Sequence, residues 1–286
     1  MQEPPPSHDP GEVVLYRVER GMAIITLNRP DRLNAWTPEL ERRYVHRLHL
    51  ATASPEVRVV LVTGAGRAFC AGADTKVLGD LAGGGRQNGQ PGGQPDVLGS
   101  RRLPVYEFEA AVPKPVIAAV HGPCVGIGFS HALMCDLRFG SPSARFGATF
   151  ARLGLPAEQG TAWLLDRLIG PSRAADLLLS GRMVGADEAL RLGLVDRLAE
   201  DALAAALDYA ADIAANCSPA SLATIKRQLQ RAAQQDFRTA ADEADQLTRE
   251  ALRSDDFGAA VRALRERRPA SFSPLSAGVD PVRPAS

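Results

Sequence analysis

The sequence of 286 residues predicts an α/β fold in which buried strands alternate with helices. Two continuous apolar runs, at 57–63 and 116–120, are typical of strands that are covered on both faces. Helix-like segments lie between and after these runs. From Asp201 onward the chain is rich in Ala, Leu, Arg, Glu and Gln with the spacing of amphipathic helices, which indicates a helical C-terminal unit.

The first third of the chain carries clear element signals. Two short β-like runs at 13–18 and 22–27 are broken by Gly21 and predict a hairpin. Thr37 is a plausible helix N-cap with Pro38 in the first turn. The helix that follows has one apolar stripe with a residue in every fourth position: Leu40, Tyr44 and Leu48.

Glycine and proline interrupt the chain at 81–100, where almost no bulky apolar residue occurs. Such a stretch predicts a long mobile loop, which is either a lid over a nearby site or a surface insertion without a role. Four C-terminal helices are expected, at 201–216, 219–234, 239–253 and 256–267. The resulting division is a flexible N-terminus at 1–11, a core at 12–200, a helical oligomerisation region at 201–268 and a disordered tail at 269–286.

Composition excludes several classes of function. Lys+Arg and Asp+Glu both number 33, so the chain has no global basic field for nucleic acid. No apolar run is long enough to span a membrane and no secretory signal is recognisable, so we expect a cytoplasmic protein without a membrane partner. The four cysteines show no zinc-binding spacing; we expect buried free thiols and no metal.

Two glycine-bearing turns are the strongest candidates for a functional site. One spans 64–74 and follows the 57–63 run; the other spans 121–128 and follows the 116–120 run. Each leads into a helical segment, whose N-terminus offers unpaired N–H donors and a partial positive charge. Two such turns can aim two N–H groups at one developing oxyanion.

Other interpretations of these turns are weaker. Either turn alone would more often serve packing than catalysis. The pair Gly64 and Gly66 lacks the third glycine of a dinucleotide fingerprint, and the second turn has the wrong glycine spacing. A phosphate loop with Gly-Lys-Ser/Thr is absent from the sequence.

Seven motifs in order resemble those of the enoyl-CoA hydratase/isomerase (crotonase) superfamily, from about Val13 to Arg267. They are Asn-Arg-Pro-Asp-Arg-Leu-Asn-Ala at 28–35, the segment 64–74 with Phe69 and Gly72-Ala73-Asp74, Pro-Lys-Pro-Val-Ile-Ala-Ala-Val-His-Gly at 113–122, Cys-Asp at 135–136, Ala-Arg-Phe-Gly at 144–147, Leu-Asp-Arg-Leu-Ile-Gly at 165–170 and Gly-Leu-Val-Asp at 193–196. Each motif is weak alone, whereas seven in order make a specific resemblance.

The resemblance implies repeated ββα units wound into a spiral, followed by a helical trimerisation region. The family usually forms homotrimers or dimers of trimers. An acyl-CoA thioester would bind with its carbonyl oxygen at the N–H groups of Ala73 and Ile127, and no separate cofactor is implied because coenzyme A is part of the substrate. The residues implied along the substrate and CoA surface are Arg32, Leu33, Ala35, Ala71, Asp74, Gly126, Ser130 and Phe150. Asp74 has an alternative role as the cap of a helix.

The chain departs from the family's hydratases at two positions. Where those enzymes carry two glutamates that hold the added water, this sequence has Ser130 and Phe150, neither of which is a carboxylate. One carboxylate, Glu158, lies thirty-one positions after Ile127, where several relatives carry a working Asp. Next to an oxyanion hole that stabilises an enolate, a single carboxylate can move the proton.

The alternatives for Glu158 are a cap on the helix that begins near Gly160, or a solvated side chain. An apolar pocket around it is expected from four residues: Ile127, Phe129, Phe150 and Trp163. Further candidates are weaker. We expect His121 to make a backbone hydrogen bond, His46 and His49 to be solvated, His131 to be structural rather than part of a Ser130–His131–Glu158 triad, and Glu107 or Glu109 to face the acyl pocket or, more plainly, solvent.

Three functions remain open at this point. The first is an enzyme that hydrates or isomerises a fatty enoyl-CoA, with Glu158 as the single acid/base. The second is a non-catalytic protein that binds acyl-CoA. The third is another enolate reaction of a CoA thioester, such as hydrolysis or C–C cleavage. Turnover separates the first from the second, and product identity separates the first from the third.

Overall fold

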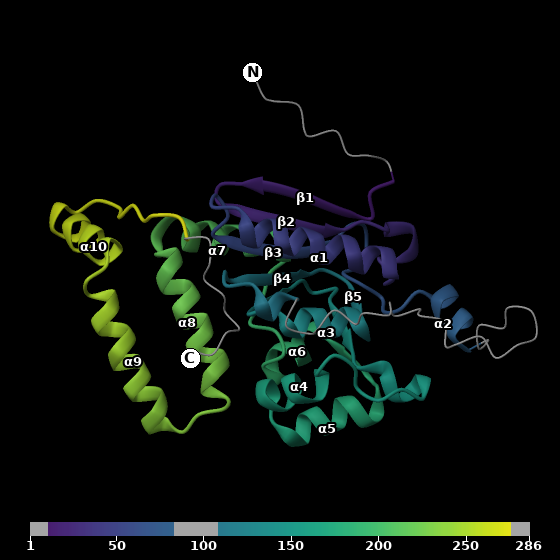
Figure 1. Cartoon of the computed structure of the whole chain (residues 1–286). Coiled ribbons are helices and arrows are strands. Elements are labelled where there is room, and N and C mark those ends of the chain that lie inside the picture. Colours follow the sequence, from purple (N-terminus) through teal and green to yellow (C-terminus); the bar gives the residue numbers. More distant parts are fainter. Residues whose placement is uncertain (1–10, 83–107, 276–286) are drawn as a thin grey trace, which may run out of the picture.

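The computed structural model describes residues 11–82 and 108–275. A six-stranded sheet forms the centre of this part, and Figure 1 shows its strands β1 to β4 side by side. The strand order is β1-β2-β3-β4-β6-β9. β1 and β2 pair antiparallel as a hairpin, and the remaining neighbours pair parallel. The strands are β1 (Val14–Glu19), β2 (Met22–Leu27), β3 (Val59–Gly64), β4 (Val116–Val120), β6 (Leu137–Gly140) and β9 (Arg197–Leu198).

A second, smaller sheet has three strands. It consists of β5 (Pro123–Val125), β7 (Arg145–Gly147) and β8 (Met183–Gly185) in the order β5-β7-β8. Twice the chain runs from the large sheet through the small sheet into a helix: β4 and β5 lead to α3 (Ile127–Met134), and β6 and β7 lead to α4 (Thr161–Ile169). Because β4 pairs with β6 and β5 with β7, both parallel, the two ββα units stack as successive turns of a spiral.

The remaining helices surround these sheets. They are α1 (Pro38–Ala53), α2 (Thr75–Ala82), α5 (Pro171–Ser180), α6 (Ala186–Leu192), α7 (Ala202–Asn216), α8 (Pro219–Ala232), α9 (Phe237–Ala251) and α10 (Asp255–Glu266), with short 3₁₀ turns η1 (Pro30–Arg32), η3 (Glu109–Ala111) and η4 (Thr149–Leu153). No helix within 11–82 or 108–275 has both the length and the apolar character needed to cross a bilayer.

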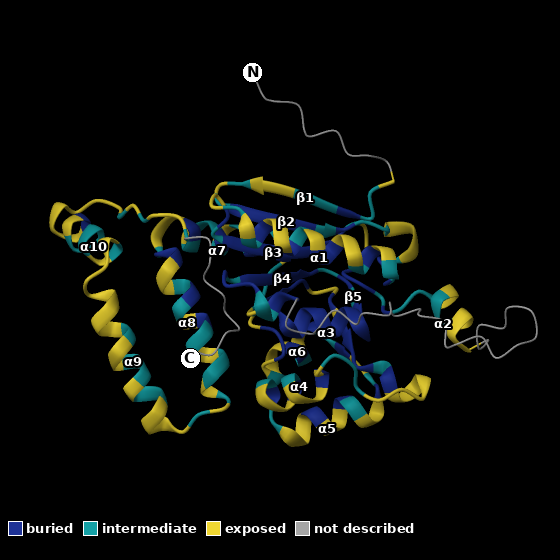
Figure 2. Cartoon of the chain, viewed as in Figure 1, coloured by how far each residue is buried: buried dark blue, intermediate teal, exposed yellow. Residues whose placement is uncertain are grey.

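The central strands are buried on both faces, as their continuous apolar sequence predicts (Figure 2). One face packs against a stripe of small residues on α7: Ala202, Ala206, Ala210 and Ala214. The other face carries the larger core, to which α1 and α3 contribute. The low aromatic content is consistent with this packing, because alanine lets α7 lie close to the sheet.

Most of the element predictions are confirmed with small shifts. The hairpin forms β1 and β2, and the Thr37 hydroxyl caps α1 by accepting the Leu40 N–H. The expected strand at 57–63 is β3, which begins at Val59. Leu81 and Ala82, which the sequence placed in the predicted loop, belong to α2 instead. The rest of the predicted loop lies outside the described residues, as do 1–10 and 276–286.

Figure 1 shows α8, α9 and α10 projecting from one side of the sheet. α8 is anchored there by Lys226, whose ammonium donates to the Asp136 carboxylate at 2.7 Å and to the carbonyls of Glu109 and Lys114. α9 has no buried residue in this single chain. The expected free thiols are present, with Cys70, Cys124 and Cys135 buried and Cys217 partly buried.

Candidate active site

The first glycine-bearing turn is held in place by the segment before α1. The buried side chain of Asn34 donates to the carbonyls of Ala65 at 2.9 Å and Ala68 at 2.8 Å, and its oxygen accepts the Arg29 N–H at 2.8 Å. Gly64 is required at this crossing, because a Cβ there would collide with the carbonyl of Ala68. The Asn34 hydrogen bonds and the close packing at Gly64 therefore hold the backbone of the first turn in one conformation.

The second turn packs directly against the first. Cys70 and Cys124 form a parallel bridge in which the Cys70 N–H donates to Pro123 O at 3.0 Å and the Val125 N–H donates to Cys70 O at 2.9 Å. Gly128 lies so close to Cys70 that a Cβ would overlap its side chain. The two turns are therefore joined by backbone hydrogen bonds and close packing.

The two proposed oxyanion residues follow immediately. Trp36 bridges the first turn on both sides of Ala73, since its N–H donates to Gly72 O at 2.8 Å and its carbonyl accepts the Asp74 N–H at 2.9 Å. In a parallel bridge this leaves the N–H of Ala73 itself pointing away from Trp36. Within the described residues, no hydrogen bond is formed by this N–H.

Ile127 occupies the matching place in the second turn. It is the first residue of α3, where an N–H has no intrahelical partner, and none is found for it among the described residues. The preceding Gly126 has φ 54° and ψ −122°, a conformation that glycine tolerates best. A Cβ on Gly126 would lie 3.8 Å from Gly72 Cα, so the residues that precede the two N–H groups are neighbours. The geometry can place both donors and the positive end of α3 on one oxygen.

The residues predicted to bind CoA gather beside this pair of turns. The Ala71 N–H donates to Leu33 O at 3.0 Å, and the Arg29 guanidinium donates both to Ala35 O and to the Asp74 carboxylate. Arg32, at the end of η1, is exposed. The structure therefore brings Leu33, Ala35, Ala71 and Asp74 together beside the first turn. Their contact with CoA stays a prediction.

Asp74 is a helix cap in this structure. Its carboxylate accepts the Lys76 N–H at 3.0 Å at the start of α2 and the Arg29 guanidinium at 2.9 Å. Partial burial alone would raise the pKa of Asp74, but the hydrogen bonds from Arg29 and Lys76 and the charges of Arg29 and Arg32 bring it below its usual value. The capping role that the sequence allowed is thus observed.

A pH-dependent loss of stability follows from this environment. Asp74→Ala should lower the free energy of unfolding at pH 7 by about 1 kcal/mol, the usual effect of losing a cap. Because the folded-state pKa is depressed, the stabilisation is present above the unfolded-state pKa and is lost as pH falls through the folded-state pKa. Urea unfolding of both proteins between pH 7 and pH 3 should show the difference shrinking below about pH 4, the ordinary range of an aspartate. A difference that does not change with pH would contradict the charged cap.

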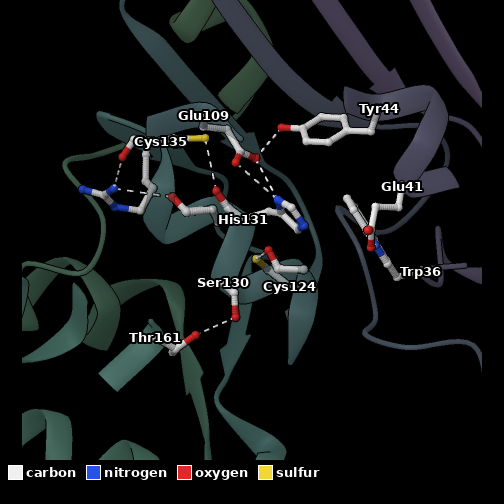
Figure 3. Close-up of polar contacts among 12 residues, drawn as sticks. Trp36, Glu41, Tyr44, Glu109, Cys124, Ser130, His131, Cys135 and Thr161 are labelled. Carbon is white, nitrogen blue, oxygen red and sulfur yellow. Dashed lines mark hydrogen bonds and ion pairs between the residues drawn. The ribbon is translucent and has the colours of Figure 1, made fainter. Parts of the chain in front are cut away.

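Ser130 is buried, and its hydroxyl has hydrogen-bond partners within the chain. Figure 3 shows its hydroxyl pointing toward the Thr161 hydroxyl. The two oxygens are 2.6 Å apart, and the Thr161 hydroxyl lies 2.6 Å from the backbone carbonyl of Glu158. The Gly126 carbonyl is a second and more distant acceptor for Ser130, at 3.3 Å. Since each hydroxyl has one proton, the arrangement that fits the two short contacts is that Ser130 donates to Thr161 and Thr161 donates to Glu158 O. The pair therefore ties the turn that bears Glu158 to the helix that bears Ile127.

Glu158 is half-buried in the turn before α4. The two residues after it, Gln159 and Gly160, both have positive φ, at 49° and 72°. The N–H of Thr161, the first residue of α4, donates to Glu158 O at 2.9 Å, so the backbone carbonyl of Glu158 accepts a hydrogen bond at the N-terminal end of α4. The positive φ angles and this hydrogen bond define a tight turn, and the turn sets the direction of the Glu158 Cα–Cβ bond.

The prediction of an apolar pocket around Glu158 is wrong for one of its four residues. Ile127, Phe129 and Phe150 are buried. Trp163 is 54% exposed, and the Arg167 guanidinium covers its ring at 4.6 Å, so it does not line an enclosed pocket. Because Trp163 is large and apolar, the sequence predicted that it lines the pocket, but it lies on the outer face of α4.

The histidines separate into surface and buried groups. His46 and His49 are exposed and His121 Nε2 lies 2.9 Å from Gly66 O, as predicted. His131 is buried and its Nδ1 lies 3.0 Å from the Glu109 carboxylate (Figure 3). A Ser130–His131–Glu158 triad therefore does not form, because Ser130 and His131 have other partners.

Glu109 corrects the expectation of a solvated face, because it is completely buried. Its carboxylate accepts hydrogen bonds from His131 and the Tyr44 hydroxyl. Glu107 lies outside the described residues. The local sequence gave no signal for this burial, since the partners of Glu109 are 22 and 65 positions away. In the described part of the chain no group of three or more His, Cys, Asp or Glu residues could hold a metal ion.

Comparison with known proteins identifies the relatives of this arrangement. The enoyl-CoA hydratase/isomerase family model matches residues 17–274. A probable enoyl-CoA hydratase of Mycobacterium tuberculosis is 41% identical over 71% of this chain and 75% of its own length. The 1,2-epoxyphenylacetyl-CoA isomerase of Escherichia coli is 34% identical over 92% of this chain and 98% of its own length.

A solved structure shows the same architecture. The enoyl-CoA hydratase of Polaromonas sp. JS666 superposes with a TM-score of 0.80 at 30% identity, covering 91% of this chain and 99% of the other. The spiral of ββα units and the paired glycine-bearing turns are the features that the family resemblance implied, and the matches point to the same family. The chain belongs to the enoyl-CoA hydratase/isomerase family and has the crotonase fold.

Proposed function

We propose that this protein is an enzyme that acts on a fatty enoyl-CoA thioester through an enolate, with Glu158 as the single acid/base. The observation that carries the proposal is the close pair of turns that leaves the N–H groups of Ala73 and Ile127 without partners in the described residues. Two such donors stabilise the negative charge that develops on a thioester oxygen when a proton leaves the α-carbon.

Double-bond isomerisation suits a single carboxylate. The Glu158 carboxylate takes a proton from the α-carbon of a 3-enoyl thioester, the electron pair moves to the carbonyl oxygen, and the two N–H groups hold the resulting dienolate. The same carboxyl group then returns the proton to the γ-carbon, which gives the conjugated 2-enoyl thioester. No atom is gained or lost, and no separate cofactor is needed because coenzyme A is carried by the substrate.

Hydration is the second candidate, and the name of the Mycobacterium tuberculosis relative favours it. In this reaction Glu158 would take a proton from water as the oxygen attacks the β-carbon and then protonate the α-carbon. Ser130 gives little help, because its hydroxyl is engaged with Thr161. Isomerisation is therefore the better match to the buried groups of this site.

A homotrimer, or a dimer of trimers, is proposed as the working assembly. The support is a set of large apolar residues left exposed on the projecting C-terminal helices of the single chain: Ile225, Leu229, Leu252, Phe257 and Leu264, with Phe237 at the start of α9. Exposed apolar surface of this extent marks an interaction site. Closed symmetry is the usual way in which copies of one chain cover it.

Purified protein incubated with 3-enoyl-CoA and trans-2-enoyl-CoA thioesters of several chain lengths tests the reaction. Isomerisation raises the conjugated-enoyl absorbance from the 3-enoyl substrates, and hydration lowers it from the 2-enoyl substrates. Mass spectrometry separates the two, since only hydration adds the mass of water. Binding without turnover of any thioester would instead support a non-catalytic acyl-CoA-binding protein, and release of free CoA would indicate hydrolysis.

A further inference from the structure

A buried polar and aromatic cluster lies next to the two turns and has no part in the proposed proton transfer. It comprises Trp36, Tyr44, Glu109 and His131, and we call it the brace (Figure 3). The four residues are between 0% and 4% exposed. They come from the segment before α1, from α1, from η3 and from α3, so the brace joins four elements.

Trp36 connects the brace to the first half of the oxyanion hole. Its backbone holds the residues on both sides of Ala73, with N–H to Gly72 O at 2.8 Å and carbonyl to the Asp74 N–H at 2.9 Å. Its indole N–H donates to the Glu41 carboxylate at 3.1 Å. A shift of Trp36 would therefore move the Ala73 N–H.

His131 connects the brace to the second half. It lies four residues after Ile127 on α3, so both occupy one face of that helix, and a helical side chain leans toward the N-terminal turn. The imidazole stacks on the Trp36 indole with centroids 4.1 Å apart and planes 22° apart. This stack is a direct side-chain contact between the segment that bridges Ala73 and the helix that begins with Ile127.

Glu109 and Tyr44 fix the orientation of the imidazole. The Glu109 carboxylate lies 3.0 Å from His131 Nδ1 and accepts a hydrogen bond from the Tyr44 hydroxyl. The rings of Tyr44 and Phe108 meet the His131 ring edge-on, with centroids 5.4 Å and 4.9 Å from its centroid. Because the carboxylate accepts, we assign the proton to Nδ1. Nε2 is buried and has no hydrogen-bond partner in the described residues.

A buried carboxylate is costly, and two leucines of similar size would fill this space without desolvating a charge. What hydrogen bonds add over apolar packing is direction, since they allow one orientation of the ring. The stack on Trp36 transmits that orientation to the first turn. The polar network thus has a geometric effect that packing alone would not give.

We propose that Glu109 and His131 are positioning residues that set the separation of the Ala73 and Ile127 N–H groups through the His131–Trp36 stack. The inference rests on the proposed function, because it assumes that these N–H groups bind the thioester oxygen. Neither residue touches the reacting atoms. Their loss should weaken polarisation of the carbonyl while leaving CoA binding almost unchanged.

The test uses full-length protein and a chromophoric substrate analogue, 4-dimethylaminocinnamoyl-CoA, whose absorbance maximum shifts to the red when its carbonyl is polarised. The main variant is His131→Leu/Glu109→Leu, which removes both partners and so leaves no buried charge unpaired. Glu109→Gln supplies a milder change of the same hydrogen bond. Val195→Ala, a buried position between α6 and β9, controls for a general loss of packing.

The expected result is that the double variant binds the probe but loses at least half of the red shift. Its kcat should fall by about 10- to 100-fold with little change in KM, as is expected for a small misplacement of an oxyanion donor. Glu109→Gln should lie between this variant and the wild type, and Val195→Ala should keep the full shift. A double variant with wild-type red shift and kcat would overturn the brace while leaving the proposed function intact. Bound probe without a red shift in the wild type would overturn the oxyanion hole and the brace together.

Discussion

Replacing Glu158 by Gln should lower kcat by about 10²- to 10⁴-fold, the usual contribution of a positioned acid/base. Gln keeps the size of the side chain but cannot accept and return a proton. The hydroxyls of Ser130 and Thr161 and the backbone of the turn are unchanged, so the thioester should still bind with similar affinity. Steady-state kinetics with the best enoyl-CoA substrate and calorimetric binding of a saturated acyl-CoA measure the two effects separately.

The matched control is Glu200→Gln, the same change at an exposed position. It should leave kcat and KM at wild-type values. If Glu158→Gln retains wild-type kcat, the assignment of Glu158 is wrong and another group moves the proton. If kcat and binding fall together with thermal stability, the side chain supports the fold rather than the reaction.

Replacing Gly126 by Ala should have the second large effect, about 10²- to 10³-fold on kcat, which is the loss seen when one oxyanion donor is removed. Space is available for the added methyl group, since its nearest neighbours are Gly72 Cα at 3.8 Å and Thr149 Oγ1 at 3.9 Å. The backbone conformation is the obstacle, because φ 54° with ψ −122° is strained for any residue with a Cβ. We expect relaxation of this strain to turn the Ile127 N–H away from the proposed oxyanion position.

Gly170→Ala provides the control for backbone strain alone. Gly170 also has positive φ, at 82°, with nothing within 4 Å of an added Cβ, and it joins α4 to α5. Both variants should lose similar stability in thermal unfolding, whereas only Gly126→Ala should lose kcat. Equal loss of activity in both variants would show that general destabilisation, and not the position of one N–H, is responsible.

Much of the fold could be predicted from local sequence. The continuous apolar runs of β3 and β4 are buried on both faces, and the Thr37 and Pro38 signal marks the start of α1 where the structure begins it. The way the turns wind into a spiral came from the family resemblance instead. Strand pairing such as β4 with β6 depends on residues about twenty positions apart, which periodicity within one element does not report.

The arrangement of the two glycine-bearing turns was predictable from local backbone signals. The partners of buried side chains, which depend on long-range contacts, were not. The glycines marked the two turns proposed to aim N–H groups at one oxygen, and the structure makes Gly72 of the first turn and Gly126 of the second neighbours. No local signal indicates that the Ser130 hydroxyl pairs with Thr161, thirty-one positions away; contact of Ser130 with the substrate stays a prediction. Glu109 was expected in solvent because its burial depends on Tyr44 and His131, which the sequence does not place beside it.

Deuterium exchange tests the central claim, that Glu158 moves a proton at a carbon made acidic by the two N–H groups. A saturated acyl-CoA, which can be neither hydrated nor isomerised, is incubated with each protein in D₂O, and incorporation at the α-carbon is followed by mass spectrometry. We expect exchange with the wild type, strong suppression with both Glu158→Gln and Gly126→Ala, and wild-type exchange with Glu200→Gln and Gly170→Ala. Undiminished exchange in Glu158→Gln, or no exchange in a wild type that binds the thioester, would contradict the proposed mechanism.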